Sequence, residues 1–295
     1  MNDNEIQNRL EDLGFIIRGG IKRNRYVNCA HESYPPKKNA VWYKVSDKYV
    51  SYASWNSCLE SGFFWLNERE YVAMDKAERE RINQQRSEEQ RKLALEDRQQ
   101  RLAAVNKAYG NFRQIKRNHA YLTRKGIDFR ADFTFDWSKR LVIPMLDITG
   151  ILCGYQYIDD VGTKKFKTGS ILKGSFYPFL VPGQKLANVE HIFLCEGVST
   201  AGSVFQSLSA DYANFAVLAC FASNNVDLIY TVLKEQGHKN IISIQDYDPA
   251  GVKVQAPGFM IGFSYGQDAN DVCCEFGSEA LRRIIKFRMQ ALNLS

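Results

Sequence analysis

The second half of the chain alternates between short apolar runs and amphipathic stretches of helical length. Strands are expected near 192–196, 215–221, 240–246 and 259–264. Helices are expected near 199–209, 226–236 and 274–291. This strand–helix alternation predicts a mostly parallel sheet with helical crossovers. The chain therefore belongs to the α/β class, and no other feature restricts its fold as much.

Three acidic stretches follow apolar runs in this half. They lie at residues 191–197, 241–251 and 268–271. In open α/β sheets the chemistry takes place at the carboxyl ends of the strands. Carboxylate oxygens are the ligands that Mg²⁺ prefers in proteins. We therefore predict a metal site made of Glu196, Asp246 and Asp248, with Asp271 as a further ligand.

Composition places weaker limits on the chain. Its length of 295 residues allows one large domain or two smaller ones, and the net charge of +6 leans toward anionic partners. Seven scattered cysteines are typical of a reducing compartment rather than a disulfide framework. The polar, acidic N-terminus predicts no signal peptide, and no apolar run approaches a membrane span. A cytoplasmic protein without membrane contact is expected.

The sequence divides into four expected segments. A small α+β module at 1–66 is the expected nucleic-acid-binding part. A charged helical linker follows at 67–118, then a basic α+β subdomain at 119–188 and the sheet-bearing catalytic domain at 189–295. The linker has no glycine or proline before Gly110 and carries acid-first i,i+4 pairs such as Asp97 with Arg101. It can be a solvated helix packed at its ends or a spacer arm.

Several further stretches carry a family resemblance. Residues 119–127 (His-Ala-Tyr-Leu-Thr-Arg-Lys-Gly-Ile), 141–156 and 164–174 precede Glu196-Gly197, and Asp246-Tyr247-Asp248-Pro249-Ala250-Gly251 follows. The two acidic motifs resemble the signatures of the Toprim domain. The whole order resembles the Toprim DNA primases of conjugative plasmids, integrative elements and satellite phages. Where those primases have an aspartate in a segment before the second acidic motif, this chain has Ala222.

The resemblance implies a metal-dependent DNA primase that makes short primers on single-stranded DNA for a mobile genetic element. It implies a Rossmann-like Toprim fold, Mg²⁺ or Mn²⁺ as cofactor, and Glu196, Asp246 and Asp248 as catalytic residues. Glu196 can instead act as a base on the attacking hydroxyl. Nucleoside triphosphates, a single-stranded template, and a helicase or replication initiator acting in trans are the implied partners.

Basic residues in the motifs are the candidate contacts to nucleic acid and nucleotides, because lysine and arginine neutralise phosphates. They are Arg124, Lys125, Lys164, Lys165, Lys167 and Lys173. In the N-terminal module, Arg23, Arg25 and Trp42 lie among other basic and aromatic residues, a composition that suits single strands. Some of those rings must instead form the core of the small sheet.

Zinc is not expected, because Cys29, His31 and Cys58 lack paired Cys-x-x-Cys spacing. Two other functions stay open. A Toprim nuclease would use the same carboxylates with water as the attacking group. A non-catalytic protein that binds single-stranded DNA would need none of them.

Overall fold

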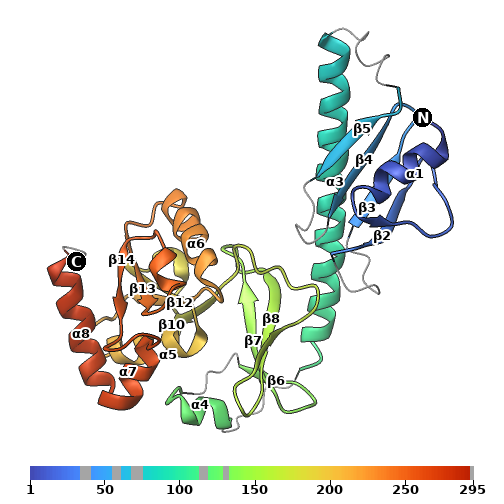
Figure 1. Cartoon of the computed structure of the whole chain (residues 1–295). Helices are drawn as coiled ribbons and strands as arrows, with labels where there is room; N and C mark the ends of the chain where they lie inside the picture. The colour runs from blue at the N-terminus through green and yellow to red at the C-terminus, as the bar shows by residue number, and fades with distance from the viewer. Residues whose placement is uncertain (34–40, 55–60, 68–75, 113–118, 129–132, 293–295) are drawn as a thin grey trace. The chain divides into compact units, whose positions relative to one another are not determined.

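The computed structural model describes residues 1–33, 41–54, 61–67, 76–112, 119–128 and 133–292. Within these residues the chain forms two compact units, residues 1–93 and 94–295 (Figure 1). The class is mixed α/β, as the sequence predicts. The four-segment division stays a prediction. No helix in the described ranges is both long and apolar enough to cross a membrane.

The first unit is one helix on an antiparallel sheet. Helix α1 (Asp3–Glu11) begins at Asn2, whose side chain and that of Glu5 cap each other's backbone N–H. Strands β1 (Phe15–Ile16), β2 (Tyr26–His31), β3 (Val41–Val45), β4 (Tyr49–Ser54) and β5 (Gly62–Trp65) pair in sequence order. Ile6 and Leu10 of the helix pack on the sheet's inner face, so burial of apolar area holds the two together.

Helix α3 (Lys76–Tyr109) covers most of the expected linker. Asp97 and Arg101 form the i,i+4 ion pair predicted from their spacing, at 2.7 Å. The helix ends directly before Gly110, as expected. Its last turns belong to the second unit, where Val105 is buried against Val142 and Tyr155.

After α3, the second unit continues with the short helix α4 (Ala120–Arg124) and a four-stranded antiparallel sheet. The strands of this sheet are β6 (Thr134–Phe135), β7 (Leu141–Leu146), β8 (Leu152–Ile158) and β9 (Lys164–Phe166). Strand β10 (Tyr177–Leu180), which the sequence groups with these strands, instead pairs antiparallel with a strand of the next sheet. That pairing joins residues about forty positions apart, so no local pattern reveals it.

The second sheet of this unit has five strands, in the order β10-β12-β11-β13-β14. Its remaining strands are β11 (His191–Cys195), β12 (Phe215–Ala219), β13 (Asn240–Asp246) and β14 (Gly258–Ile261). These four run parallel, which confirms the mostly parallel sheet. Short 3₁₀ helices, η1 (Leu186–Asn188) and η2 (Gly251–Lys253), lie beside the sheet.

Helices cover both faces of this sheet (Figure 1). Helix α6 (Ser223–Glu235) covers one face, where Val226 packs with Leu194. Helices α5 (Val198–Leu208), α7 (Ala269–Phe276) and α8 (Ser278–Ala291) cover the other, which includes Phe193. Alternate residues of the buried β11 therefore belong to different cores.

The prediction of a single helix at 274–291 is wrong, because the end of α7 and the whole of α8 occupy these residues. Gly277 lies between α7 and α8 with φ of +87°, a left-handed conformation that glycine adopts without strain. The predicted strand at 259–264 also ends early, at Ile261. A loop over residues 262–267 follows it and leads directly into α7.

Candidate functional site

The parallel strands bring two of the predicted acidic motifs to one edge of the sheet. Glu196 follows the last residue of β11, and Asp246 is the last residue of the neighbouring β13. Asp248 lies two residues further on. Its Oδ1 accepts hydrogen bonds from the backbone N–H groups of Ala250 and Gly251, at 2.9 and 2.7 Å. The carboxyl ends of these strands thus carry three carboxylates.

The three carboxylates lie close enough for their charges to raise the pKa values of Glu196 and Asp246. Burial, followed by the charges of Asp268, Glu196 and Asp248, raises the pKa of Asp246 to about 7. Burial raises the pKa of Glu196 as well, and the charge of Asp248 is the second cause of this rise. Oδ1 of Asp246 is buried and has no hydrogen-bond partner. The site therefore concentrates negative charge that the described residues compensate only in part.

Lys164 supplies the compensating positive charge. It is the first residue of β9, and its charge lowers the pKa of both Glu196 and Asp246. Its Nζ lies 4.0 Å from the point that a β-carbon would occupy on Gly197. The basic segment and the acidic motifs, separated in sequence, therefore meet in space.

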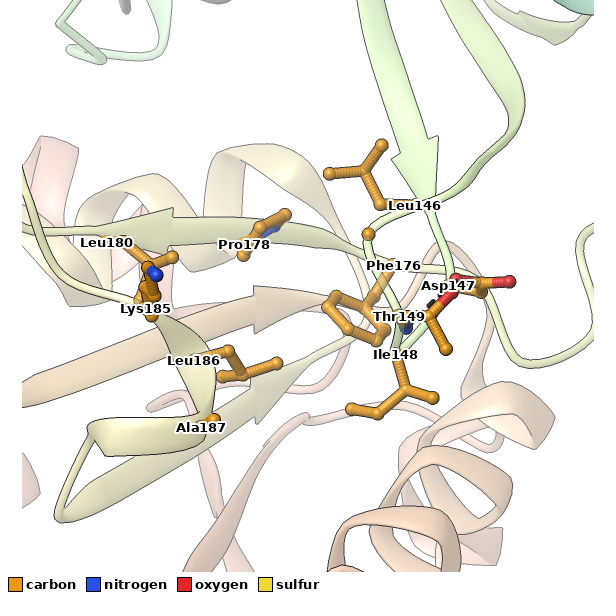
Figure 2. A pocket seen from close by; sticks show the side chains of 11 residues that line it. Leu146, Asp147, Ile148, Thr149, Phe176, Pro178, Leu180, Lys185, Leu186 and Ala187 are labelled. Carbon is orange, nitrogen blue, oxygen red and sulfur yellow. Dashed lines mark hydrogen bonds between the residues drawn. The ribbon is translucent and has the colours of Figure 1, made fainter.

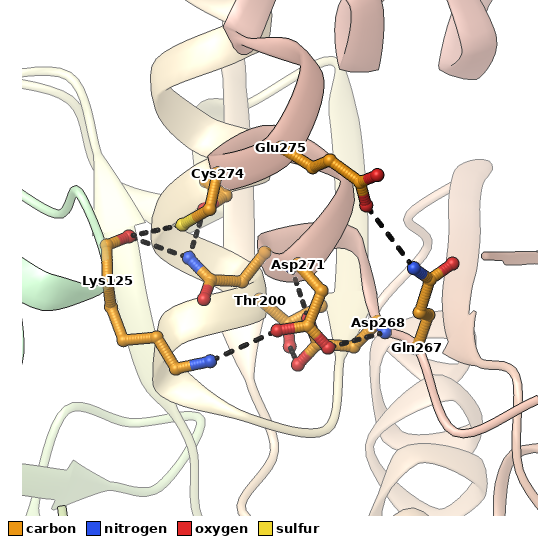
Figure 3. A network of polar contacts seen from close by, with 9 residues as sticks. Lys125, Thr200, Gln267, Asp268, Asp271, Cys274 and Glu275 are labelled. Atoms are coloured by element: carbon orange, nitrogen blue, oxygen red, sulfur yellow. Dashed lines mark hydrogen bonds and ion pairs between the residues drawn. The ribbon is translucent and has the colours of Figure 1, made fainter. Parts of the chain in front are cut away.

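Asp271 has a different environment from the one predicted (Figure 3). Its Oδ1 accepts an ion-pairing hydrogen bond from Nζ of Lys125 at 3.2 Å, and its Oδ2 accepts one from the backbone N–H of Asp268. Asp268 is the N-cap of α7, and its Oδ2 accepts a hydrogen bond from Thr200 Oγ1 at 2.9 Å. Asp268 is the charge with the largest effect on Asp246.

Asp268 lies in the third acidic stretch but was not predicted as a site residue. The signal was present, because an acid three residues after an N-cap acid is typical of a capping box. In such a box the later side chain turns back to the helix start. Asp271 does so here, and Asp268 is left near the end of β13.

The remaining predicted contacts lie in varied surroundings. Lys165 and Lys173 are exposed, and Lys167 is half-buried. Arg124 donates two hydrogen bonds to the carbonyl of Asp160, in the turn between β8 and β9. In the first unit Arg25 is exposed, Arg23 pairs with Asp3 at 2.7 Å, and Trp42 is buried against Tyr26. Trp55, Lys37, Lys38 and Cys58 lie outside the described residues.

No three histidine, cysteine or acidic side chains in the described ranges are gathered closely enough to hold a metal ion. Cys29 and His31 are both buried, in β2. The donor atoms at the sheet edge are carboxylate oxygens, the type that Mg²⁺ and Mn²⁺ take. Three features of the site fit a cation. Its donor atoms are carboxylate oxygens, the neighbouring carboxylates raise the pKa of Asp246, and Oδ1 of Asp246 has no hydrogen-bond partner.

A hollow of about 360 Å³ lies elsewhere in the second unit (Figure 2). Its wall is mainly apolar, with Leu146, Phe176 and Leu186 among its residues. Neither Glu196 nor the Asp246–Asp248 pair lines it. This hollow is therefore not part of the carboxylate site.

Comparison with known proteins adds one curated relative. No protein-family model matches the chain. The chain is 29% identical over 166 residues to DNA primase TraC of Escherichia coli. The match covers 55% of this chain and only 11% of the length of that relative. It confirms the resemblance to a DNA primase that the motifs indicate.

Solved primase structures also match the chain, at low scores. The DnaG primase catalytic domain bound to single-stranded DNA matches with a TM-score of 0.47 at 13% identity, over 67% of this chain and 80% of that one. The Aquifex aeolicus primase, with its zinc-binding and RNA polymerase domains, matches with a TM-score of 0.45 at 15% identity, over 96% and 82%. At such scores and identities the likeness does not extend to function.

Proposed function

We propose that this chain is a metal-dependent DNA primase with a Toprim-type catalytic domain. The observation that carries the proposal is the coupling of Asp246 to Glu196 and Asp248 at the carboxyl ends of neighbouring parallel strands. The matched region of TraC, whose name is that of a DNA primase, agrees with it. We also propose, from the motif resemblance, that the primers serve the replication of a mobile genetic element.

Glu196, Asp246 and Asp248 would hold Mg²⁺ or Mn²⁺. We propose Asp268 as the fourth carboxylate in place of Asp271, because Lys125 and the Asp268 backbone already occupy Asp271. Two divalent ions at such a site stabilise charge on the attacking hydroxyl, the phosphoryl oxygens and the leaving group. The chain's own part is to gather the carboxylates and limit their repulsion.

Lys164 would meet a phosphate of the incoming nucleoside triphosphate, because it already faces the carboxylates. The exposed Lys165 and Lys173, together with Lys167, would neutralise phosphates of the single-stranded template. Arg124 would act indirectly, since its bonds to Asp160 hold the turn that leads into Lys164. A helicase or replication initiator would act in trans.

Primer synthesis on circular single-stranded DNA tests this function. Labelled nucleotides and Mg²⁺ or Mn²⁺ would be supplied to wild type, to an Asp246→Asn, Asp248→Asn double variant, and to Asp211→Asn. Asp211 is a matched control because it pairs with Lys286 beyond the opposite end of α5 from Glu196. Short labelled products from wild type and Asp211→Asn, and none from the double variant, are expected.

The same reaction distinguishes the two alternatives. Metal-dependent nicking of the circle without labelled products would assign a nuclease that uses the same carboxylates. Tight binding of the circle by wild type and double variant alike, with neither activity, would assign a single-stranded-DNA-binding protein.

A further inference from the structure

Four exposed aromatic side chains gather on the segments that follow β13 and β14. Tyr247 separates Asp246 from Asp248 in sequence, Phe263 and Tyr265 lie in the 262–267 loop, and Phe276 is the last residue of α7. Their exposed fractions are 37%, 66%, 69% and 51% respectively. Gathered exposed apolar side chains commonly mark an interaction surface. We call these four residues the aromatic cluster.

The rings of the cluster form two edge-to-face pairs. Tyr247 and Tyr265 have centroids 6.0 Å apart and planes at 70°, while Phe263 and Phe276 are 5.2 Å apart at 80°. In such a pair, the ring that turns its edge toward its partner keeps both of its own faces clear of that partner. Each pair therefore leaves a flat face available to a ligand.

Backbone hydrogen bonds fix the cluster relative to the carboxylates. The N–H of Tyr247 donates to the carbonyl of Gln267 at 2.9 Å, and the N–H of Gly266 donates to the carbonyl of Tyr247 at 2.7 Å. Gln267 Oε1 also accepts from the N–H groups of Phe263 and Ser264. Asp268 follows Gln267 directly, so one braced loop carries both the rings and a site carboxylate.

We propose that the aromatic cluster is a stacking platform for unpaired nucleobases. The inference rests on the proposed function, because the phosphates of that strand or nucleotide would lie at the carboxylate site beside the rings. Stacking on aromatic side chains tolerates any base, as template reading requires. Arg288 lines the same small hollow as Phe263, which adds a positive charge beside the platform.

A nucleic acid fits this surface better than a protein does. The cluster itself is wholly aromatic, and the exposed aliphatic Val252 lies further along the segment after β13. Protein interfaces are also rich in aromatic residues, so the choice of a nucleic acid rests on the adjacent carboxylate site, where phosphates would bind. The bases can come from the template or from a nucleoside triphosphate, and both present the same flat ring.

Binding of an intact and a base-free strand by the full chain tests the platform. A fluorescently labelled dT12 and a matched strand with abasic sites would be titrated in the presence of a chelator, with anisotropy as readout. Wild type should bind the intact strand at least about tenfold more tightly. Tyr247→Ala with Tyr265→Ala should lose that preference and weaken dT12 binding about tenfold or more, with little change for the abasic strand.

Three further variants control for folding and for nonspecific loss of apolar surface. Tyr247→Phe with Tyr265→Phe keeps both rings and should bind as wild type does. Phe287→Ala removes an exposed ring from α8 and should leave dT12 binding unchanged. Tyr265→Ala alone, in an exposed loop position, provides the test if the double alanine variant does not fold.

A second arm measures thymidine triphosphate binding by equilibrium dialysis. Loss of triphosphate binding alone in the alanine variant would assign the platform to the incoming nucleotide, and loss of dT12 binding would assign it to the strand. Unchanged affinity for both would overturn the proposal. Changed self-association of the chain at unchanged affinity for both would make the cluster a protein contact.

The titration needs neither metal nor turnover, so it is separate from primer synthesis. Base-dependent binding through the rings in a protein that makes no primers would keep the platform and overturn the primase. Primer synthesis by a protein whose DNA binding does not depend on the rings would keep the primase and overturn the platform.

Discussion

At the scale of single residues, Asp246 has the largest pKa shift among the carboxylates of the described residues. Its pKa is raised from 3.8 to about 7 by burial and then by the neighbouring carboxylates. The folded chain therefore holds a proton on this side chain that the unfolded chain releases near pH 4. Stability should fall as the pH rises from about 4 to about 7, and the loss should be complete above that range.

Asp246→Asn should remove this loss. A pKa raised from 3.8 to about 7 corresponds to at most about 4 kcal/mol of unfolding free energy. The variant should be more stable than wild type at pH 8 by up to that amount, and equal to it below pH 4. Urea unfolding with a chelator across this pH range measures both. Equal stability of the variant and wild type at pH 8 would mean that burial and the neighbouring charges do not destabilise the ionised Asp246.

Asn225 is a neutral side chain whose buried hydrogen bonds also affect the stability of the second unit. It is buried, its amide N–H₂ donates to the carbonyls of Leu172, Ser175 and Cys220, and its Oδ1 accepts from the N–H of Gly174. It thus fastens the start of α6 to the chain segment before β10. The exposed neighbour Asn224 has no comparable burial.

Asn225→Ala should lower the unfolding free energy by about 1–3 kcal/mol or more, because buried backbone groups lose their partners. Asn224→Ala should change it by less than about 0.5 kcal/mol. Thermal unfolding followed by circular dichroism compares the two. Similar melting temperatures would show that the Asn225 network adds little to stability.

At the scale of elements, Gly251 lets the chain fold back against the end of β13. A β-carbon on Gly251 would collide with the carbonyl oxygen of Asp246. Only a residue without that carbon permits the turn that brings the N–H of Gly251 to Asp248. The glycine after the second acidic motif therefore shapes the carboxylate site itself.

Gly251→Ala should cost about 1–3 kcal/mol of unfolding free energy and disturb the site. Gly110→Ala is the matched control, because the nearest atom to its added carbon, the carbonyl oxygen of Asn106, is 3.6 Å away and its backbone is not left-handed. That control should be neutral or slightly stabilising. Urea unfolding of both variants decides the matter, and equal effects would contradict the close approach.

The elements also differ in how far local sequence determines them. Strands β11, β12 and β13 appear within about two residues of their predicted bounds, because continuous apolar runs are typical of strands buried on both faces. The break at Gly277 was missed because the apolar spacing continues across it. The place of β10 depends on pairing with a distant strand, and the choice of Asp268 over Asp271 depends on a cap.

At the scale of the whole molecule, the candidate site belongs to one compact unit. Glu196, Asp246, Asp248, Asp268 and Lys164 all lie within 94–295, as do the two cores on either face of the five-stranded sheet. The sequence predicted this concentration of chemistry in the second half. It could not predict where α3 passes from one unit to the other.

A fragment of residues 94–295 should therefore unfold cooperatively on its own. Its melting temperature should rise on addition of Mg²⁺ by about as much as that of the full chain, because a ligand of the folded state alone stabilises it. Differential scanning fluorimetry of both proteins is the measurement. A fragment that folds without any response to Mg²⁺, beside a responsive full chain, would locate part of the site in residues 1–93.

The most direct test of the account is Mn²⁺ binding followed by electron paramagnetic resonance. The signal of free Mn²⁺ should fall on titration with the wild-type chain and with Asp211→Asn. It should fall much less with the Asp246→Asn, Asp248→Asn variant, which lacks two of the four carboxylates, and urea unfolding checks that this variant is folded. Equal binding by all three proteins would show that the sheet-edge carboxylates are not the metal site.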